Sequence, residues 1–196
     1  MLYLWDIIGT YVFCVSGAIA ARQKDMDWFG MFMLALITGT GGGTLRSMMI
    51  GDTPPPIFKD PIYLFLAAGA VMTALFAAPY WEKRRRIVSA IDAIGLGVFV
   101  CIGVQVALNR HLDWWAAVGM GVITATFGGV IRDVVRTEVP LIFRKEIYAT
   151  ACAIGGLIYL ALESIGAPSS LNSVATVVSV ASIRLLAIRY ALNQSS

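Results

Sequence analysis

Two short motifs that join glycines to an arginine are the segments of this chain best suited to chemistry. One is Thr38–Arg46, with the letters TGTGGGTLR, and the other is Thr124–Arg132, with the letters TATFGGVIR. A glycine inside a helix costs about 1 kcal/mol relative to alanine, so the first cluster predicts a broken helix. A break exposes carbonyls, which suit cations, and N–H groups, which suit anions or water. We therefore expect a transient monovalent cation site at the backbone carbonyls near Gly41, Gly42 and Gly128.

The glycines also have a purely structural interpretation. Gly39 and Gly43 are four residues apart, a spacing that lets membrane helices pack closely. The second cluster, Gly128 and Gly129, repeats the pattern at an equivalent depth. This duplication favours a role in conduction or binding, because discontinuous helices in paired repeats are a recurring feature of transport proteins.

Arg46 and Arg132 each follow their glycines by three residues. An arginine facing lipid near mid-bilayer costs at least ~2.5–3.5 kcal/mol, so each should face the protein interior or water. Asp6 and Asp92 stand near the starts of two other apolar segments, at equivalent positions. Two interpretations remain open: they pair with the arginines or face a vestibule, or they mark helix starts at the headgroup level.

Four threonines lie just before the glycines: Thr38, Thr40, Thr124 and Thr126. Their hydroxyls are hard oxygen ligands that fit weak contact with a cation. A threonine in a membrane helix also commonly bonds to the carbonyl four residues earlier. The sequence favours neither interpretation.

The composition identifies the element type that must position these residues. Hydrophobic residues make up 58% of the 196 and charged residues only 14%, against about 25% charge in soluble domains. The net charge of +3 is no sign of nucleic-acid binding. The single histidine, His111, and the apolar settings of Cys14, Cys101 and Cys152 leave almost no material for zinc or histidine chemistry, and we expect no cofactor.

Apolar runs of about 20 residues, long enough to cross a ~30 Å hydrocarbon core, recur along the chain. They predict an all-α membrane protein with seven transmembrane helices, the second and fifth broken at the glycines. The expected spans are Leu2–Ala21, Trp28–Ile50, Pro61–Trp81, Ile87–Leu108, Trp114–Val135, Glu146–Leu162 and Leu171–Leu192.

Positive charges give the orientation. Ten lysines and arginines fall in loops or span ends on one side and two on the other, so the richer side is cytoplasmic. The N-terminus is then outside and the C-terminus inside. The basic cluster of this side, Lys83, Arg84, Arg85 and Arg86, acts as a topology signal or contacts anionic lipid.

The chain repeats itself. Shifted by 86 positions, Asp6–Arg46 falls on Asp92–Arg132 without a gap, and with one residue dropped Tyr63 continues onto Tyr148. We expect residues 1–196 to form one transmembrane domain, with repeats over 2–81 and 87–162 and a seventh helix over 171–192. Three spans per repeat is an odd number, so the second copy is inverted, and a transport path is expected at the repeat interface.

Gly-Gly-Gly-x-x-Arg at 41–46 and Gly-Gly-x-x-Arg-Asp at 128–133, within seven spans, resemble the trimeric intracellular cation channel family in its prokaryotic branch. The resemblance covers nearly the whole chain. It implies a homotrimer in a bacterial plasma membrane, surrounded by lipids. It also implies one pore per protomer for potassium and sodium, lined by the second and fifth spans with help from the first and fourth.

The two copies differ where it matters for a gate. Ser47 stands where Asp133 stands in the second copy, and Gly41 is at the position equivalent to Phe127. We therefore expect unequal halves, with a stronger gate on one side. The residues expected to line or gate the path are Asp6, Thr38, Thr40, Gly41, Gly42, Gly43, Arg46, Asp92, Thr124, Thr126, Gly128, Gly129, Arg132 and Asp133.

Three functions follow in decreasing order of support. The first is a monovalent cation channel. The second is a secondary transporter of a small amino acid such as glycine, in which half-helix N-termini and an arginine hold the carboxylate. The third, a membrane enzyme, has no nucleophile with clustered acids to support it.

Overall fold

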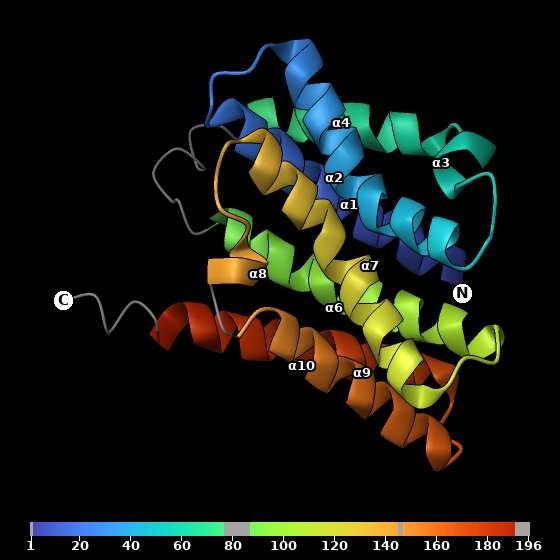
Figure 1. Cartoon of the computed structure of the whole chain (residues 1–196). Coiled ribbons are helices and arrows are strands. Elements are labelled where there is room, and N and C mark those ends of the chain that lie inside the picture. Colours follow the sequence, from blue (N-terminus) through green and yellow to red (C-terminus); the bar gives the residue numbers. More distant parts are fainter. Residues whose placement is uncertain (1, 77–86, 145–146, 191–196) are drawn as a thin grey trace.

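The computed structural model describes residues 2–76, 87–144 and 147–190. Figure 1 shows a bundle of long helices. Within the described ranges, the long helices are α1 (Leu2–Arg22), α2 (Trp28–Met49), α4 (Ile62–Phe76), α6 (Ile87–Asn109), α7 (Trp114–Val135), α9 (Ala149–Ser164) and α10 (Ser169–Tyr190). They coincide, to within a few residues where the structure describes both ends, with the seven segments predicted from hydropathy.

Five of these helices are long and apolar enough to cross a membrane: α1, α2, α6, α7 and α10. Helices α4 and α9 are apolar but shorter, with 15 and 16 residues. The predicted third span continued to Trp81 and the sixth began at Glu146, and both ends lie outside the described residues. The basic cluster Lys83, Arg84, Arg85 and Arg86 also lies outside them.

Two short helices were not predicted. Helix α3 (Pro56–Lys59) and helix α8 (Leu141–Arg144) each form one turn in segments that the sequence indicated as polar connections. They follow α2 and α7, so each repeat carries the same extra turn at the same place. Pro56 occupies the first turn of α3, where its missing N–H costs no hydrogen bond.

Helices α2 and α7 run without interruption through the glycine clusters. The predicted break is therefore wrong, and the carbonyls near Gly41, Gly42 and Gly128 are not freed, because a continuous α-helix uses them for its own hydrogen bonds. The cluster serves close packing instead. A Cβ added at Gly42 would overlap the carbonyl oxygen of Thr124, and one at Gly128 would overlap that of Thr38.

Close approach at glycines also brings α1 and α6 together. The Phe13 and Phe99 rings pack with centroids 5.1 Å apart and are inclined at 42°. A Cβ at Gly95 would overlap the Phe13 ring, and one at Gly9 would lie 3.3 Å from the Phe99 ring. The two repeats thus meet through reciprocal pairs in which a phenylalanine of one repeat fills the space left by a glycine of the other.

The ends of the helices place the two arginines far apart. Figure 1 shows α1 beginning and α2 ending at one end of the bundle, whereas α6 begins and α7 ends at the other. Asp6 and Arg46 belong to the first pair of ends, and Asp92 and Arg132 to the second. Helix α10 lies outside this central group, packed against α6 and α9.

Candidate functional site

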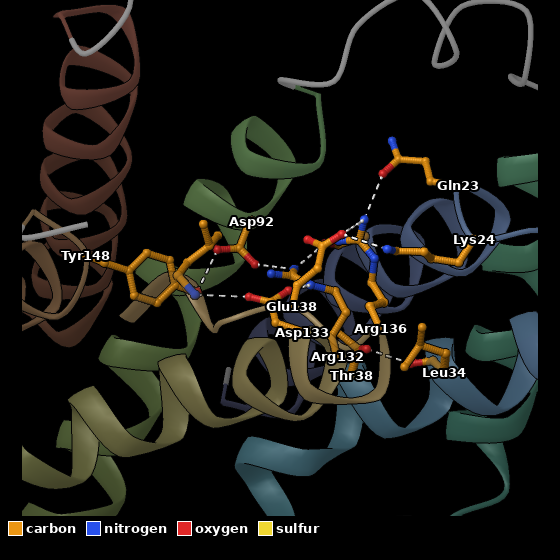
Figure 2. A network of polar contacts seen from close by, with 12 residues as sticks. Gln23, Lys24, Leu34, Thr38, Asp92, Arg132, Asp133, Arg136, Glu138 and Tyr148 are labelled. Carbon is orange, nitrogen blue, oxygen red and sulfur yellow. Dashed lines mark hydrogen bonds and ion pairs between the residues drawn. The ribbon is translucent and has the colours of Figure 1, made fainter. Parts of the chain in front are cut away.

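The second repeat holds a buried cluster of Asp92, Arg132 and Tyr148, which we call the second triad. Arg132 Nη1 donates to Asp92 Oδ1 at 2.6 Å, and the Tyr148 hydroxyl donates to Asp92 Oδ2 at 2.8 Å. Figure 2 shows Asp92 between the tyrosine and the guanidinium. Asp92 is 0% exposed and Arg132 is 1% exposed. Both carboxylate oxygens therefore receive a hydrogen bond, as a buried charge requires.

Two further side chains, those of Asp133 and Ser16, accept hydrogen bonds from Arg132 of the second triad. Arg132 Nε donates to Asp133 Oδ1 at 2.9 Å, and its Nη1 also donates to Ser16 Oγ at 2.7 Å. Asp133 Oδ2 accepts the backbone N–H of Leu141 at 3.1 Å, which ties the first residue of α8 to α7. The guanidinium thus links α6, α7 and α1, because its partners come from all three helices.

The first repeat holds the equivalent cluster of Asp6, Arg46 and Tyr63, which we call the first triad. The Tyr63 hydroxyl donates to Asp6 Oδ2 at 2.6 Å, as Tyr148 does to Asp92. Arg46 Nη2 lies 4.0 Å from Asp6 Oδ1, beyond hydrogen-bond distance. Its Nη1 is buried and has no hydrogen-bond partner among the described residues. The first arginine is therefore buried but loosely held.

The weaker bonding of Arg46 is explained by two sequence differences between the copies. Ser47 replaces Asp133, so Arg46 has no carboxylate on the next residue. Pro56 replaces Leu141, and proline has no N–H for such a carboxylate to accept. The two exchanges belong together, because an acid at position 47 would have found only one of the two partners that Asp133 has.

Three of the four threonines use their hydroxyls within their own helix. Thr38, Thr40 and Thr126 donate to the carbonyls of Leu34, Leu36 and Val122 at 2.6, 2.7 and 2.9 Å. The hydroxyl of Thr124 is buried without a partner in the described part of the chain. Back-bonding, one of the two interpretations left open by the sequence, thus applies to three of them.

A narrow crevice runs beside the first triad. Its volume is about 10 Å³, roughly the space of a single water. It is lined by Asp6, Thr10, Gly39, Thr40, Gly43, Thr44, Pro56, Ile57, Tyr63 and Phe99. The crevice joins the acid and tyrosine of the first triad to the Phe99 ring, which packs on Phe13. In this conformation the crevice leaves no room for a hydrated ion.

Partly exposed ion pairs lie beside the two triads. Beside the second triad, Lys24 and Arg136 lie 3.3 and 3.2 Å from Glu138 Oε1, an arrangement visible in Figure 2. Beside the first triad, Lys59 lies 3.0 Å from Asp52. The hydrogen bond from Lys59 holds the pKa of the Asp52 carboxyl below its usual value. Within the described ranges, no group of three or more His, Cys, Asp or Glu side chains is arranged to hold a metal ion.

The structure brings together most of the residues singled out from sequence. Asp6 joins Arg46, and Asp92 joins Arg132 and Asp133, which resolves the open question about the aspartates in favour of pairing. Sequence reasoning missed Ser16, Tyr63 and Tyr148 as partners. The signal for the tyrosines was present, since they match one another in the repeat, whereas nothing in the sequence indicated Ser16.

Comparisons with known proteins agree with this architecture. A family model described as "Glycine transporter" matches residues 3–79 and 89–164. The chain is 43% identical to a UPF0126 membrane protein of Vibrio cholerae, over 98% of this chain and 81% of that protein. It is 42% identical to the UPF0126 inner membrane protein YadS of Escherichia coli, over 98% of this chain and 94% of that protein.

Solved structures share the fold. A trimeric intracellular cation channel orthologue from Rhodobacter sphaeroides superposes with a TM-score of 0.89 at 35% identity, covering 97% of this chain and 98% of that one. A prokaryotic TRIC channel studied in potassium chloride superposes with a TM-score of 0.88 at 31% identity, covering 97% of each chain. The chain therefore belongs to the family of the glycine transporter model and the UPF0126 membrane proteins, and to the prokaryotic branch of the trimeric intracellular cation channel family.

Proposed function

We propose that the protein is a monovalent cation channel for potassium and sodium, assembled as a homotrimer with one path per protomer. The path runs between the two inverted repeats, and the observation that carries it is the pair of Asp–Arg–Tyr triads at opposite ends of the bundle. The related solved structures, described as TRIC cation channels, support the same function.

The physical role of the triads follows from their charges. An arginine beside a carboxylate neutralises the mouth of a path and repels cations, whereas the carboxylate alone attracts them. Movement of Arg46 or Arg132 away from its aspartate would therefore convert a closed mouth into a cation-attracting one. Because α2 and α7 touch through Gly42 and Gly128, opening also requires these helices to separate between the triads.

The proposed topology has seven spans, with the N-terminus outside and the C-terminus in the cytoplasm. The two stretches matched by the family model begin at residues 3 and 89, a difference of 89 − 3 = 86, which equals the shift that aligns the repeats. Impermeant maleimide should label Lys59→Cys but not Lys24→Cys in intact cells of a variant whose native cysteines are replaced. The reverse result would invert the topology.

The test of the channel is planar-bilayer recording of the purified protein. We expect single-channel steps in potassium and in sodium, with reversal potentials that shift toward the cation equilibrium potential in a salt gradient. Asp6→Asn and Asp92→Asn should each weaken cation selectivity at one mouth, because each removes the carboxylate that attracts the cation. Absence of steps in both salts at every voltage would contradict the proposal.

The second candidate is a secondary transporter of a small amino acid such as glycine. It is favoured by Arg46 Nη1, which has no hydrogen-bond partner among the described residues and fits a carboxylate, and by the description of the family model. Proteoliposomes distinguish the two. Saturable glycine uptake that unlabelled glycine competes away would support a transporter, and a flux that rises linearly with concentration would exclude it.

A further inference from the structure

Arg184 is a buried charge that belongs to neither repeat. It lies on α10, is 3% exposed, and donates from Nη1 to the carbonyl of Ile147 at 2.8 Å. Its guanidinium carbon lies 4.7 Å from the centroid of the Tyr148 ring. None of the ion pairs found in the described ranges includes Arg184. A buried cation in a membrane protein without an adjacent counter-ion calls for a physical reason.

The position of Tyr148 supplies the connection to the second triad. One face of its ring meets Arg184, and its hydroxyl donates to Asp92, which in turn accepts from Arg132. Arg184 also fixes the carbonyl of Ile147, the residue just before this tyrosine. Helix α10 is thus connected to Arg132 through three successive contacts.

Charge counting gives Arg184 its role. In the first triad Asp6 and Arg46 sum to zero, and Ser47 adds nothing. In the second repeat Asp92, Arg132 and the neighbouring Asp133 sum to −1, because Asp133 is an extra carboxylate beside the second triad. Arg184 brings that sum to zero. An uncompensated buried charge is costly, so the balance matters for stability.

Among the described residues no guanidinium packs on the tyrosine of the first triad, and this tyrosine is held differently. Asp60 accepts the N–H of Ile62 at 2.9 Å, next to Tyr63, and the hydroxyl of Tyr3 at 2.6 Å. A carboxylate therefore stands beside the turn that precedes Tyr63, where a guanidinium stands beside the turn that precedes Tyr148.

We propose that Arg184 is a positioning residue of the second triad. It supplies the positive charge that balances the net charge of Asp92, Arg132 and Asp133, and it keeps Tyr148 against Asp92. Helix α10 thereby determines how tightly Arg132 is held. The gating part of this inference rests on the proposed channel function, whereas the charge balance does not.

The experiment compares Arg184→Gln, Asp133→Asn and the double variant, with Arg189→Gln as a matched control at an exposed site of the same helix. The melting temperature in detergent and the open probability in bilayers are measured for each. Arg184→Gln should lower the melting temperature by about 5–10 °C. It should raise the open probability by about tenfold. Arg189→Gln should match the wild type.

The double variant separates charge balance from local bracing. It restores a sum of zero, so it should regain most of the melting temperature lost in Arg184→Gln. If Arg184→Gln yields no folded protein, recovery of folded protein in the double variant is the expected result. Arg184→Lys, which keeps the charge, should stay close to the wild type.

The proposal is overturned if Arg184→Gln leaves the melting temperature unchanged, or if Asp133→Asn fails to restore it. In the second case Arg184 only braces the carbonyl of Ile147. Absence of current in the wild type would instead contradict the channel function, while the melting temperatures would still decide the charge balance. Wild-type open probability in a destabilised Arg184→Gln variant would remove the gating part alone.

Discussion

The two triads contain the same three residue types in the same arrangement, yet one is tightly bonded and the other is not. Arg132 has direct hydrogen bonds to Asp92, Asp133 and Ser16. Arg46 has one carboxylate at 4.0 Å and a guanidinium nitrogen without a partner in the described part of the chain. Both repeats thus contain the aspartate, arginine and tyrosine. The differences at Ser47 and Pro56 mean that only the arginine of the second triad is directly hydrogen-bonded to carboxylates.

This difference predicts which half moves first. A charge held by several short hydrogen bonds leaves its site less readily than one held by a distant carboxylate, because each charge-assisted hydrogen bond must be broken. We therefore expect the first triad to open and close readily and the second to limit the open probability.

The largest expected effect comes from removing the carboxylate of each triad in turn. Asp92→Asn leaves a fully buried Arg132 short of one charge partner, and breaking a buried pair in this way costs about 3 kcal/mol. Asp6→Asn should cost less, because the Asp6–Arg46 pair is already long at 4.0 Å and its loss breaks no direct hydrogen bond between the two side chains. Thermal unfolding of both variants in detergent measures the difference. Equal losses would show that the contrast between the triads has no energetic meaning.

The next effect comes from exchanging the residue that distinguishes the copies. Ser47→Asp gives Arg46 an adjacent carboxylate and should lower the open probability, whereas Asp133→Ser removes one from Arg132 and should raise it. One charge-assisted hydrogen bond is worth about 1.5–3 kcal/mol, which corresponds to roughly tenfold or more in an equilibrium. Single-channel recording of the two variants decides the matter. Shifts in the same direction would contradict the model.

A smaller effect is expected at the glycines that face each arginine. A Cβ at Gly129 would lie 3.0 Å from the Tyr148 hydroxyl, whereas one at Gly43 would meet only Arg46 Nη2, at 3.7 Å. Gly129→Ala should therefore destabilise the protein by about 1 kcal/mol, on the scale of modest overpacking. Gly43→Ala should be neutral or slightly stabilising, because alanine favours the helix. Melting temperatures of the two variants test the prediction, and a larger loss for Gly43→Ala would refute it.

Much of this architecture could be predicted from sequence. Hydropathy located the seven long helices of the described ranges, because long apolar runs stand out from the polar connections between them. The repeat showed that Asp6 is equivalent to Asp92 and that Arg46 is equivalent to Arg132. The mismatch of Ser47 with Asp133 indicated that the two halves are unequal. These are properties that pattern and charge carry directly.

The glycine clusters were misjudged for a physical reason. Helix propensity counts the cost of glycine in isolation, whereas tertiary packing lets the Gly42 and Gly128 backbones approach the carbonyls of Thr124 and Thr38. That contact joins residues far apart in the chain, so no local rule foresees it. The contacts of Arg184 could not be foreseen for the same reason, since they join it to a distant segment and it has no counterpart in the repeat.

The smallest effect is expected at the partly exposed ion pairs beside the two triads, which differ in what they connect. Glu138 joins Lys24 of one repeat to Arg136 of the other, whereas the Asp52–Lys59 pair lies within a single connection. Glu138→Gln should therefore loosen the contact between repeats and lower stability by less than about 1 kcal/mol, as exposed pairs do. Asp52→Asn should cause no measurable change.

Ionic strength tests whether the Glu138 effect is electrostatic. The stability difference between Glu138→Gln and the wild type should be visible in low salt and vanish near about 1 M, where the screening length falls to ~3 Å. Asp52→Asn serves as the control, because it removes a carboxylate of similar exposure whose ion pair, with Lys59, lies within one connection. A difference that persists in high salt would mean that Glu138 acts through packing or hydrogen bonding, and that the second mouth is held together by more than charge.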